Sequence, residues 1–353
     1  MYTIHATNVN EALPLGVGLF KVANSVRRIA PRGTATLEIK HPVLTVYKNP
    51  LERVLYHPLR DANPFFHFFE ALWILAGRND VAWLAHFLPK MSEYSDDGEV
   101  FYGAYGARIR YDEIDQLADV IKLLKADPDS RRAVVGIWQP DLDSGYTGKD
   151  MPCNCTITFK LRDGALNMTV FNRSNDMVWG AYGANAVQFA TLLEYMAGML
   201  GVKPGIYYQW SDSFHVYEDE PAWQRIKHLD LTRLDPYDYP PTMYAHYFPA
   251  VTKQVLDAFE IPVRSYPLVE VPEDFDVELR HFCDRIQNIP EVDLSEAGYV
   301  NPYFDKVALP LFLALAAHRA GDRMLSMLHA NDCAASDWRL AALLWMHRRW
   351  KEA

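Results

Sequence analysis

The segment from Pro152 to Tyr217 constrains the fold of this chain more than any other part of the sequence. Apolar residues alternate over 156–161 and again over 166–170, on either side of an Arg-Asp-Gly tripeptide, which predicts two strands joined by a tight turn. Apolar residues then recur at helical spacing over 185–200, before 205–217 returns to a strand-like composition. The segment is therefore expected to fold as a hairpin, a helix and a third strand.

Reactive and charged side chains lie at the boundaries between these predicted elements. A cysteine precedes the hairpin, an arginine and an aspartate lie near the end of its second strand, an asparagine begins the helix, and a histidine lies near the end of the third strand. The predicted elements can bring these side chains to one face: Cys153, Arg173, Asp176, Asn185 and His215.

The composition of the 353-residue chain, 50% hydrophobic and 23% charged, is that of a globular protein with one large or two smaller domains. A net charge of -10 argues against nucleic acid as a partner, so an anionic substrate would need a local arginine cluster. The four cysteines suggest no secreted disulfide framework, the N-terminus lacks a signal segment, and no apolar run is long enough for a membrane. We expect a cytoplasmic protein without a membrane partner.

Several separated motifs follow one another in a specific order. They are Asp-Pro-x-Ser-Arg-Arg at 127–132, Pro-Cys at 152–153, Arg-Ser-x-Asp-x-x-x-Gly at 173–180, an asparagine that opens the helix, and His-x-Tyr at 215–217. In this order the motifs resemble those of the thymidylate synthase family, which includes the phage deoxypyrimidine hydroxymethylases. The resemblance extends roughly over residues 25–217.

This resemblance implies an α/β (α+β) fold, in which a thymidylate-synthase-like mixed or antiparallel sheet packs against helices and mediates a homodimer. We expect the catalytic domain to occupy residues 1–270. Residues 218–270 are rich in Pro, Asp and Tyr, and the segment 234–250 is expected to form ordered irregular structure. Apolar residues at helical spacing predict a helical C-terminal extension over 271–353. Its expected helices are 275–286, 307–320 and 338–350.

The chemistry of the family explains the need for a cysteine. C5 of a pyrimidine is a weak nucleophile, but a thiolate that adds to C6 converts the ring into an enolate or enamine that attacks a one-carbon unit. Cys153 is the expected nucleophile, with a pKa lowered by a nearby arginine. Glu70 is the one acid in the apolar helix 64–77 and would shift its pKa upward or find a partner, unless it points to solvent. The resemblance implies that Glu70 organises water around the pyrimidine.

Two more residues complete the expected catalytic set. Tyr102 resembles the tyrosine that helps to remove the C5 proton, although it could equally be a core or turn aromatic. Asn154 stands where the family has the histidine of Pro-Cys-His, and Met91 and Tyr94 stand where methylating members carry tryptophans that shelter the exocyclic methylene from water. These departures favour water over hydride as the final reactant.

The resemblance assigns a further group of residues to a pyrimidine nucleoside monophosphate. The expected phosphate ligands are Arg32, Arg131, Arg132, Arg173 and Ser174. Arg27 or Arg28 could take the place of Arg32 as the phosphate ligand. Alternatively, this segment is a solvated basic loop that binds no phosphate. The paired arginines at 131–132 are expected to reach the phosphate of the other subunit across a dimer interface, since a guanidinium fork suits a phosphate dianion.

Three residues are expected to bind the base and the sugar. Asn185 aligns with the residue that reads the pyrimidine, provided that one residue is inserted at Gly183-Ala184, and an amide suits uracil better than cytosine. The alternative role of Asn185 is to cap its helix. His215 and Tyr217 alternate on a strand and resemble the pair that binds the 3′-hydroxyl of deoxyribose.

Folate completes the set of expected ligands. The resemblance implies 5,10-methylenetetrahydrofolate as the cofactor, and it assigns Asp176, Trp73 and Gly180 to the binding of folate.

Cys153 and Cys155 form a Cys-x-Cys pair, but no second cluster of cysteines or histidines has ligand spacing, so we expect no metal site.

The function that these residues favour is folate-dependent hydroxymethylation of C5 of dUMP through a covalent cysteine adduct. Alternatives that share the same motifs are a thymidylate synthase and a dCMP or CMP hydroxymethylase. An alternative of another class is a catalytically dead module that binds nucleotide or serves assembly, although such a module has no need for the thiol of Cys153.

Overall fold

The fold is built on an eight-stranded mixed sheet with the main strand order β1-β4-β10-β9-β8-β7, and β3 pairs with both β10 and β2. The computed structural model describes residues 1–22, 24–111, 113–228, 235–238, 263–288 and 298–350. The strands are β1 (Tyr2–Ala6), β2 (Val26–Ile29), β3 (Thr36–Ile39), β4 (Val43–Tyr47), β5 (Arg110–Tyr111), β6 (Ile114–Asp115), β7 (Val134–Gly136), β8 (Asn154–Arg162), β9 (Ala165–Asp176) and β10 (Lys203–Tyr217).

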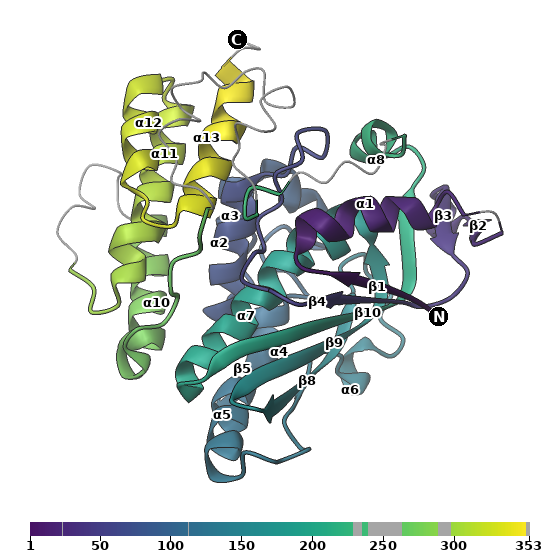
Figure 1. Ribbon diagram of the computed structural model, residues 1–353, viewed down its shortest axis with the longest axis horizontal. Helices are drawn as coiled ribbons and strands as arrows, with labels where there is room; N and C mark the ends of the chain where they lie inside the picture. Colours follow the sequence, from purple (N-terminus) through teal and green to yellow (C-terminus); the bar gives the residue numbers. More distant parts are fainter. Residues whose placement is uncertain (23, 112, 229–234, 239–262, 289–297, 351–353) are drawn as a thin grey trace.

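Helices pack against one face of this sheet and beside it (Figure 1). The α-helices are α1 (Val9–Leu19), α2 (Pro64–Leu75), α3 (Val81–Phe87), α4 (Tyr105–Ile109), α5 (Gln116–Ala126), α6 (Pro140–Asp143), α7 (Asn185–Leu200), α8 (Pro221–Ile226), α10 (Pro272–Asn288), α11 (Leu309–Arg319), α12 (Arg323–Asp332) and α13 (Ser336–Trp350). Shorter turns of 3-10 or π type are η1 (Pro31–Gly33), η2 (Pro89–Tyr94), η3 (Met177–Ala184) and η6 (Phe304–Ala308).

The expected hairpin, helix and third strand are confirmed. Strands β8 and β9 are antiparallel, and both Asp163 (φ 53°) and Gly164 (φ 73°) of their turn adopt positive φ, as a tight hairpin turn requires. Helix α7 spans the expected residues and ends at Gly201 in the left-handed conformation. Strand β10 is parallel to β9 and antiparallel to β4 and β3, so the predicted mixed sheet is correct.

The residue inserted before α7 is accommodated by η3, a π-helical segment in which Tyr182 and Gly183 have non-helical dihedral angles. A π-helical turn takes up an extra residue without shifting the helix that follows it, and such turns are frequent at functional sites. Gly183 is needed here because a Cβ atom would lie 2.9 Å from the carbonyl oxygen of Val178. The insertion expected at Gly183-Ala184 thus lies in this segment, and Asn185 keeps its place at the start of α7.

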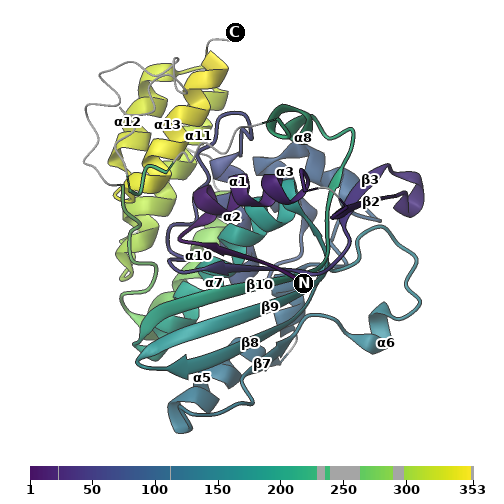
Figure 2. The ribbon, with the colours of Figure 1, turned by 45° about the vertical axis from the view of Figure 1, so that its right-hand side comes forward.

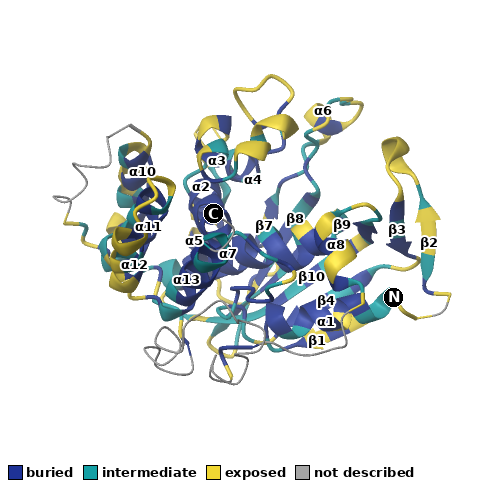
Figure 3. Ribbon diagram, turned by 90° about the horizontal axis from the view of Figure 1, so that it is seen from above, coloured by how far each residue is buried: buried dark blue, intermediate teal, exposed yellow. Residues whose placement is uncertain are grey.

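Helix α2 is buried along its whole length because it is covered from two sides. Helix α7 packs against one side, and helices α10, α11 and α13 of the C-terminal region contact α2 as well. On the side of the C-terminal helices, Phe68 makes ring contacts with Tyr303 and Trp338, and Phe65 makes one with Trp345. In Figure 3, α2 and α7 are coloured as buried, whereas much of α12 is exposed.

The C-terminal helices differ from expectation in one respect. The structure has α10, α11 and α13 near the expected ranges, but α12 was not predicted from the sequence. Helix α12 exposes Met324 and Leu328 and buries Ser326 and Ala330, so the face that it buries is not the one that its larger apolar residues mark. The boundary between a domain over 1–270 and an extension over 271–353 stays a prediction, and most of the Pro- and Tyr-rich segment before it lies outside the described residues.

We expect Trp338→Ala to lower the free energy of unfolding by about 3–5 kcal/mol, because a large aromatic side chain is removed from a packed core. Trp338 is 2% exposed, and its ring meets that of Phe68 at 5.2 Å between centroids. Denaturant titration followed by circular dichroism measures the effect. Leu328→Ala on the exposed side of α12 is the control, with an expected change within about 0.5 kcal/mol. A loss below about 1 kcal/mol for Trp338→Ala would show that α13 adds little to the core.

The opposite face of the sheet is bare in the part of the chain that the structure describes. None of the described helices crosses the face of β8 and β9 that is turned toward the viewer in Figure 2. Phe171 on β9 and Val134 on β7 are 40% and 49% exposed. Among the described residues, we find no helix with the length and apolar character needed to cross a membrane.

Candidate active site

Cys153 lies directly before β8, in a loop that Arg173 of β9 holds in place. The backbone N–H of Arg173 donates to the carbonyl oxygen of Cys153 at 3.0 Å. Its guanidinium donates to the carbonyl oxygens of Pro152 at 2.9 Å and Met151 at 3.2 Å. A β-bulge between Asn154 and Thr156 interrupts the pairing of β8 with β9 just after the cysteine. Bulges of this kind redirect side chains beside active sites.

Burial raises the pKa of the Cys153 thiol, while Arg173 and Arg32 act to lower it and Asp150 to raise it. The expectation of a lowered pKa for this thiol is therefore wrong for the free protein, because the loss of hydration outweighs the positive charges. The two arginines nevertheless act in the expected direction, since both lower the pKa of the thiol. Their guanidinium groups therefore lie within electrostatic range of Cys153.

Glu70 does not point to solvent. It is 7% exposed, and burial raises its pKa to about 8, an effect that the neighbouring Gln188 amide opposes. Its Oε2 atom is buried without a hydrogen-bond partner among the described residues. The carboxyl group therefore sits on the side of α2 that faces α7, opposite the aromatic contacts with the C-terminal helices. A carboxyl group whose pKa lies near neutrality is suited to proton transfer.

The structure brings Tyr105, rather than the expected Tyr102, close to Cys153 and Glu70. Burial raises the pKa of Tyr105, and the neighbouring thiol of Cys153 and carboxyl of Glu70 raise it further, while the Asn154 amide opposes them. The Tyr102 hydroxyl instead donates to the carbonyl oxygen of Leu142 at 2.7 Å. Tyr102 was expected at the site, and the structure places it in a neighbouring loop.

Close packing of two helices explains this placement. A Cβ atom on Gly106 would lie 2.3 Å from the carbonyl oxygen of Ile74, so only glycine lets α4 approach α2 this closely. Tyr105 is the residue before this contact and is thereby held beside Glu70. The sequence repeats a Tyr-Gly pair at 102–103 and 105–106, which is the signal that could have drawn attention to Tyr105.

Strand β10 brings the expected sugar residues into register with an expected phosphate residue and an expected folate residue on β9. Ser213 pairs with Ser174, and His215 pairs with Asp176. His215 Nδ1 lies 3.1 Å from the carbonyl oxygen of Ser213, and the rings of His215 and Tyr217 are 5.4 Å apart. The five residues therefore form one polar row along the ends of two adjacent strands.

Asn185 does not cap α7, because its side chain makes no capping bond. Its Nδ2 donates to Oδ1 of Asn175 at 3.1 Å, and Nδ2 of Asn175 donates to the hydroxyl of Ser211 at 3.0 Å. This chain of buried hydrogen bonds fixes the orientation of the Asn185 amide. A Cβ atom on Gly180 would lie 2.5 Å from Oδ1 of Asn175, so Gly180 leaves room for this network.

Asp176 lies beside two residues that the sequence did not single out, Arg60 and Trp179. Asp176 Oδ1 accepts the backbone N–H of Trp179 at 2.6 Å, while its Oδ2 is buried without a hydrogen-bond partner among the described residues. Burial raises the pKa of Asp176, and His215 and Arg60 act to lower it. The Arg60 guanidinium lies 4.8 Å from the centre of the Trp179 ring, which is 40% exposed.

Trp73 is placed differently from the other expected residues. Its indole N–H donates to Asp80 at 3.2 Å, and its ring packs on Phe101 at 5.9 Å. Both contacts hold the loop after α2, so the geometry gives Trp73 no direct part in the site.

All four arginines among the expected phosphate ligands are exposed. Arg32 adopts a left-handed conformation in η1 and reaches the carbonyl oxygen of Lys149 at 3.5 Å. Arg27 and Arg28 pair with Glu38 and Glu218, which favours Arg32 over them as a phosphate ligand. Arg131 and Arg132 are exposed at the start of the segment that leads into β7.

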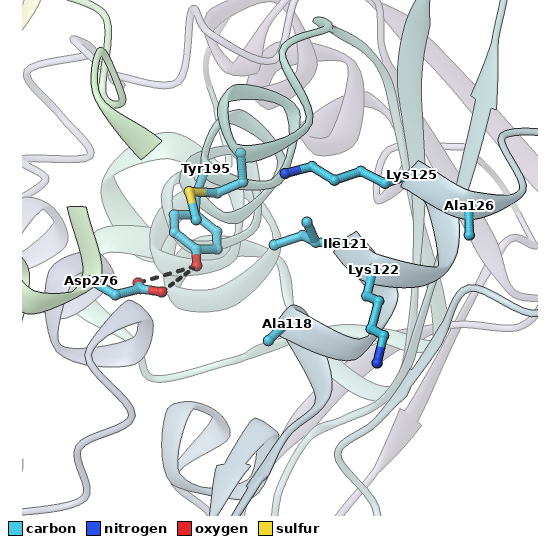
Figure 4. A pocket seen from close by; sticks show the side chains of 8 residues that line it. Ala118, Ile121, Lys122, Lys125, Ala126, Tyr195 and Asp276 are labelled. Carbon is cyan, nitrogen blue, oxygen red and sulfur yellow. Dashed lines mark hydrogen bonds between the residues drawn. The ribbon is translucent and has the colours of Figure 1, made fainter. Parts of the chain in front are cut away.

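A hollow of about 510 Å³ lies outside this site, between α5, the end of α7 and α10. Figure 4 shows Tyr195 bonded to Asp276 on one side of it and Lys122 and Lys125 on the other. None of the residues expected to bind nucleotide or folate lines this hollow.

Comparison with known proteins agrees with the motifs in this site. The family model described as thymidylate synthase matches residues 62–258. A protein of Pseudomonas phage M6 called deoxyuridylate hydroxymethyltransferase is 40% identical over 359 residues, which cover 99% of this chain and 95% of that protein. A protein of Bacillus phage SP01 with the same name is 48% identical over 204 residues, 54% of this chain and 53% of that protein. A putative thymidylate synthase of Methanosarcina acetivorans is 37% identical over 155 residues, 42% of this chain and 69% of that protein.

Proposed function

Because this chain belongs to the thymidylate synthase family, we propose that it is a one-carbon transferase that hydroxymethylates C5 of dUMP with methylenetetrahydrofolate. The observation that carries the proposal is the cluster of a half-buried thiol, Cys153, with Tyr105 and Glu70. Such a set can add to C6 of a pyrimidine and then handle the proton of C5. The similarity to proteins named deoxyuridylate hydroxymethyltransferase supports dUMP as substrate and water as the final reactant.

In this proposal Cys153 attacks C6 as the thiolate. The arginines near the thiol favour its charged form, and their effect grows when the bound nucleotide excludes water from around them. The neutral hydroxyl of Tyr105 hydrogen-bonds the water molecule that takes the proton from C5, and this water passes the proton on to solvent. The carboxyl group of Glu70 helps to hold the water around the ring. Tyr105 thus takes the role that the sequence assigned to Tyr102.

The polar row on β9 and β10 supports the binding of a nucleoside monophosphate. Arg32, Arg173 and Ser174 would contact the phosphate, His215 and Tyr217 the 3′-hydroxyl of deoxyribose. The oriented amide of Asn185 can donate to O4 of uracil and accept from its N3–H, whereas cytosine presents the opposite pattern. This amide therefore favours dUMP over dCMP.

Asp176 and Trp179 fit a reduced folate. The free Oδ2 of Asp176 can accept an N–H of the pteridine, and the Trp179 ring, supported by Arg60, offers a flat apolar surface. Gly180 follows Trp179 and allows the backbone to stay close to Asn175. When bound, methylenetetrahydrofolate supplies the electrophilic one-carbon unit.

We propose a homodimer that forms through the bare face of the sheet. Phe171 and Val134 are exposed there, and contact with a second copy would bury them. Arg131 and Arg132 are exposed in one copy, where they could reach the phosphate held by the other. Four free cysteines and a nucleotide substrate suit the reducing cytoplasm.

A product assay tests this proposal. The protein is incubated with methylenetetrahydrofolate and dUMP, dCMP or CMP in turn, products are identified by mass, and dihydrofolate formation is followed optically. We expect 5-hydroxymethyl-dUMP without dihydrofolate, and at least tenfold slower reaction of dCMP because of Asn185. A methyl product with an equal amount of dihydrofolate would instead make this chain a thymidylate synthase.

A further inference from the structure

Four buried polar atoms, on α2, on α7 and on the residue that follows Cys153, have no hydrogen-bond partner among the described residues. They are Oε2 of Glu70, Oε1 of Gln188, and Nδ2 and Oδ1 of Asn154. The three residues are 7%, 5% and 0% exposed. Buried polar atoms are nearly always hydrogen-bonded, to protein or to ordered water. These side chains are therefore built to hold a small polar molecule.

The three side chains come from different elements and meet at one place. Gln188 lies one turn after Asn185 on α7, and its amide opposes the rise in the pKa of Glu70 on α2. Glu70 and Asn154 in turn both act on the pKa of Tyr105, as does Cys153. Gln188 was not singled out by the sequence motifs, because a glutamine within an apolar helix has no spacing that marks it.

These atoms match the hydrogen-bonding groups of one water molecule. Two acceptors, Oε2 of Glu70 and Oε1 of Gln188, can receive its two O–H groups, and the Nδ2 group of Asn154 can donate to one of its lone pairs. The second lone pair is then free to attack. We propose that Gln188, together with Asn154, positions the water that reacts with the exocyclic methylene, with Glu70 as the acceptor of its proton.

The step rests on the proposed hydroxymethylation and balances as follows. The water oxygen forms a bond to the exocyclic carbon, and the electron pair of the exocyclic double bond moves into the ring as an enolate. The enolate then re-forms the C5–C6 double bond and expels the Cys153 thiolate from C6. The proton that water loses passes to the carboxylate of Glu70. Gln188 acts as a positioning residue, because it holds the water and makes no bond to the nucleotide.

Gln188→Leu tests this role, because leucine keeps the volume and removes both polar atoms of the amide. Enzyme in excess is mixed with dUMP tritiated at C5, methylenetetrahydrofolate and 2-mercaptoethanol, a thiol that competes with water for the exocyclic methylene. Release of tritium in the first turnover reports the steps before trapping. The ratio of hydroxymethyl product to thioether product reports the trapping itself.

We expect Gln188→Leu to release tritium within about threefold of the wild-type rate and to lower the ratio of hydroxymethyl to thioether product at least tenfold. Thr191→Val, one turn further along α7, removes another buried polar group and is expected to leave the ratio unchanged. If the leucine variant does not fold, Gln188→Met is the second variant, because methionine has an unbranched side chain of a length similar to that of glutamine. An unchanged ratio in whichever folded variant is measured would overturn the role of Gln188. A wild-type protein that forms only a methyl product would overturn the proposed function itself.

Discussion

Cys153→Ser is expected to abolish both tritium release from C5 of dUMP and product formation, with a loss of about 10⁴-fold or more. The thiolate is the species that adds to C6, and a serine hydroxyl cannot supply a comparable anion without an adjacent base. Asn154 stands directly after Cys153, and the groups that act most on the pKa of the thiol are Arg173, Asp150, Cys155 and Arg32, none of which is a neutral base that could activate a serine hydroxyl.

Cys155→Ser is the matched control, since it makes the same change two residues further along the chain. Cys155 is half-buried, and it has no role in the proposed mechanism. Its activity should stay within about threefold of the wild type. Binding of dUMP to Cys153→Ser, measured by calorimetry, should persist because the arginines and Asn185 are unchanged. A Cys153→Ser protein with more than about 1% of wild-type activity would contradict covalent catalysis by this thiol.

Tyr105→Phe is expected to lower kcat by about 10²–10⁴-fold, because the hydroxyl that holds the water molecule taking the C5 proton is lost while the ring stays in place. Tyr102→Phe tests the residue that the sequence favoured. It removes a hydrogen bond to Leu142 in a loop, which is worth about 1 kcal/mol of stability, and it should change kcat by less than about threefold.

Tritium release distinguishes the two tyrosines directly. Tyr105→Phe should slow the release of tritium from C5 as much as it slows product formation, because both follow removal of the C5 proton. A normal rate for Tyr105→Phe together with a slow rate for Tyr102→Phe would reverse the assignment that the geometry supports.

The predictable parts of this site are those fixed by local sequence. The hairpin with its positive-φ turn, the helix 185–200 with Gly201 at its end, and the motifs at 127–132 and 173–180 all follow from residues close together in the chain. Local propensity and turn chemistry decide such elements, so the sequence shows them. The mixed sheet followed from the resemblance of those motifs to a known family.

The C-terminal region shows where sequence patterns stop being informative. Trp338 and Trp345 pack on phenylalanines of α2 that lie more than 250 residues earlier in the chain, yet no local pattern pairs them. Arg348 and Arg349 likewise meet Asp61 at 2.9 Å, in the loop that leads to α2. These contacts hold the helix that carries Glu70, so the described C-terminal helices support the position of that residue.

The sequence by itself determined the family, the choice of Cys153 as the proposed nucleophile, and the row of polar residues on the two central strands. Only the tertiary structure decided which tyrosine faces the thiol and whether the thiol is acidified. Close approach of α4 to α2 at Gly106 selects Tyr105, and burial outweighs Arg173 in setting the pKa of Cys153. Both outcomes depend on the distance between elements and on the exclusion of water, which are properties of packing rather than of local sequence.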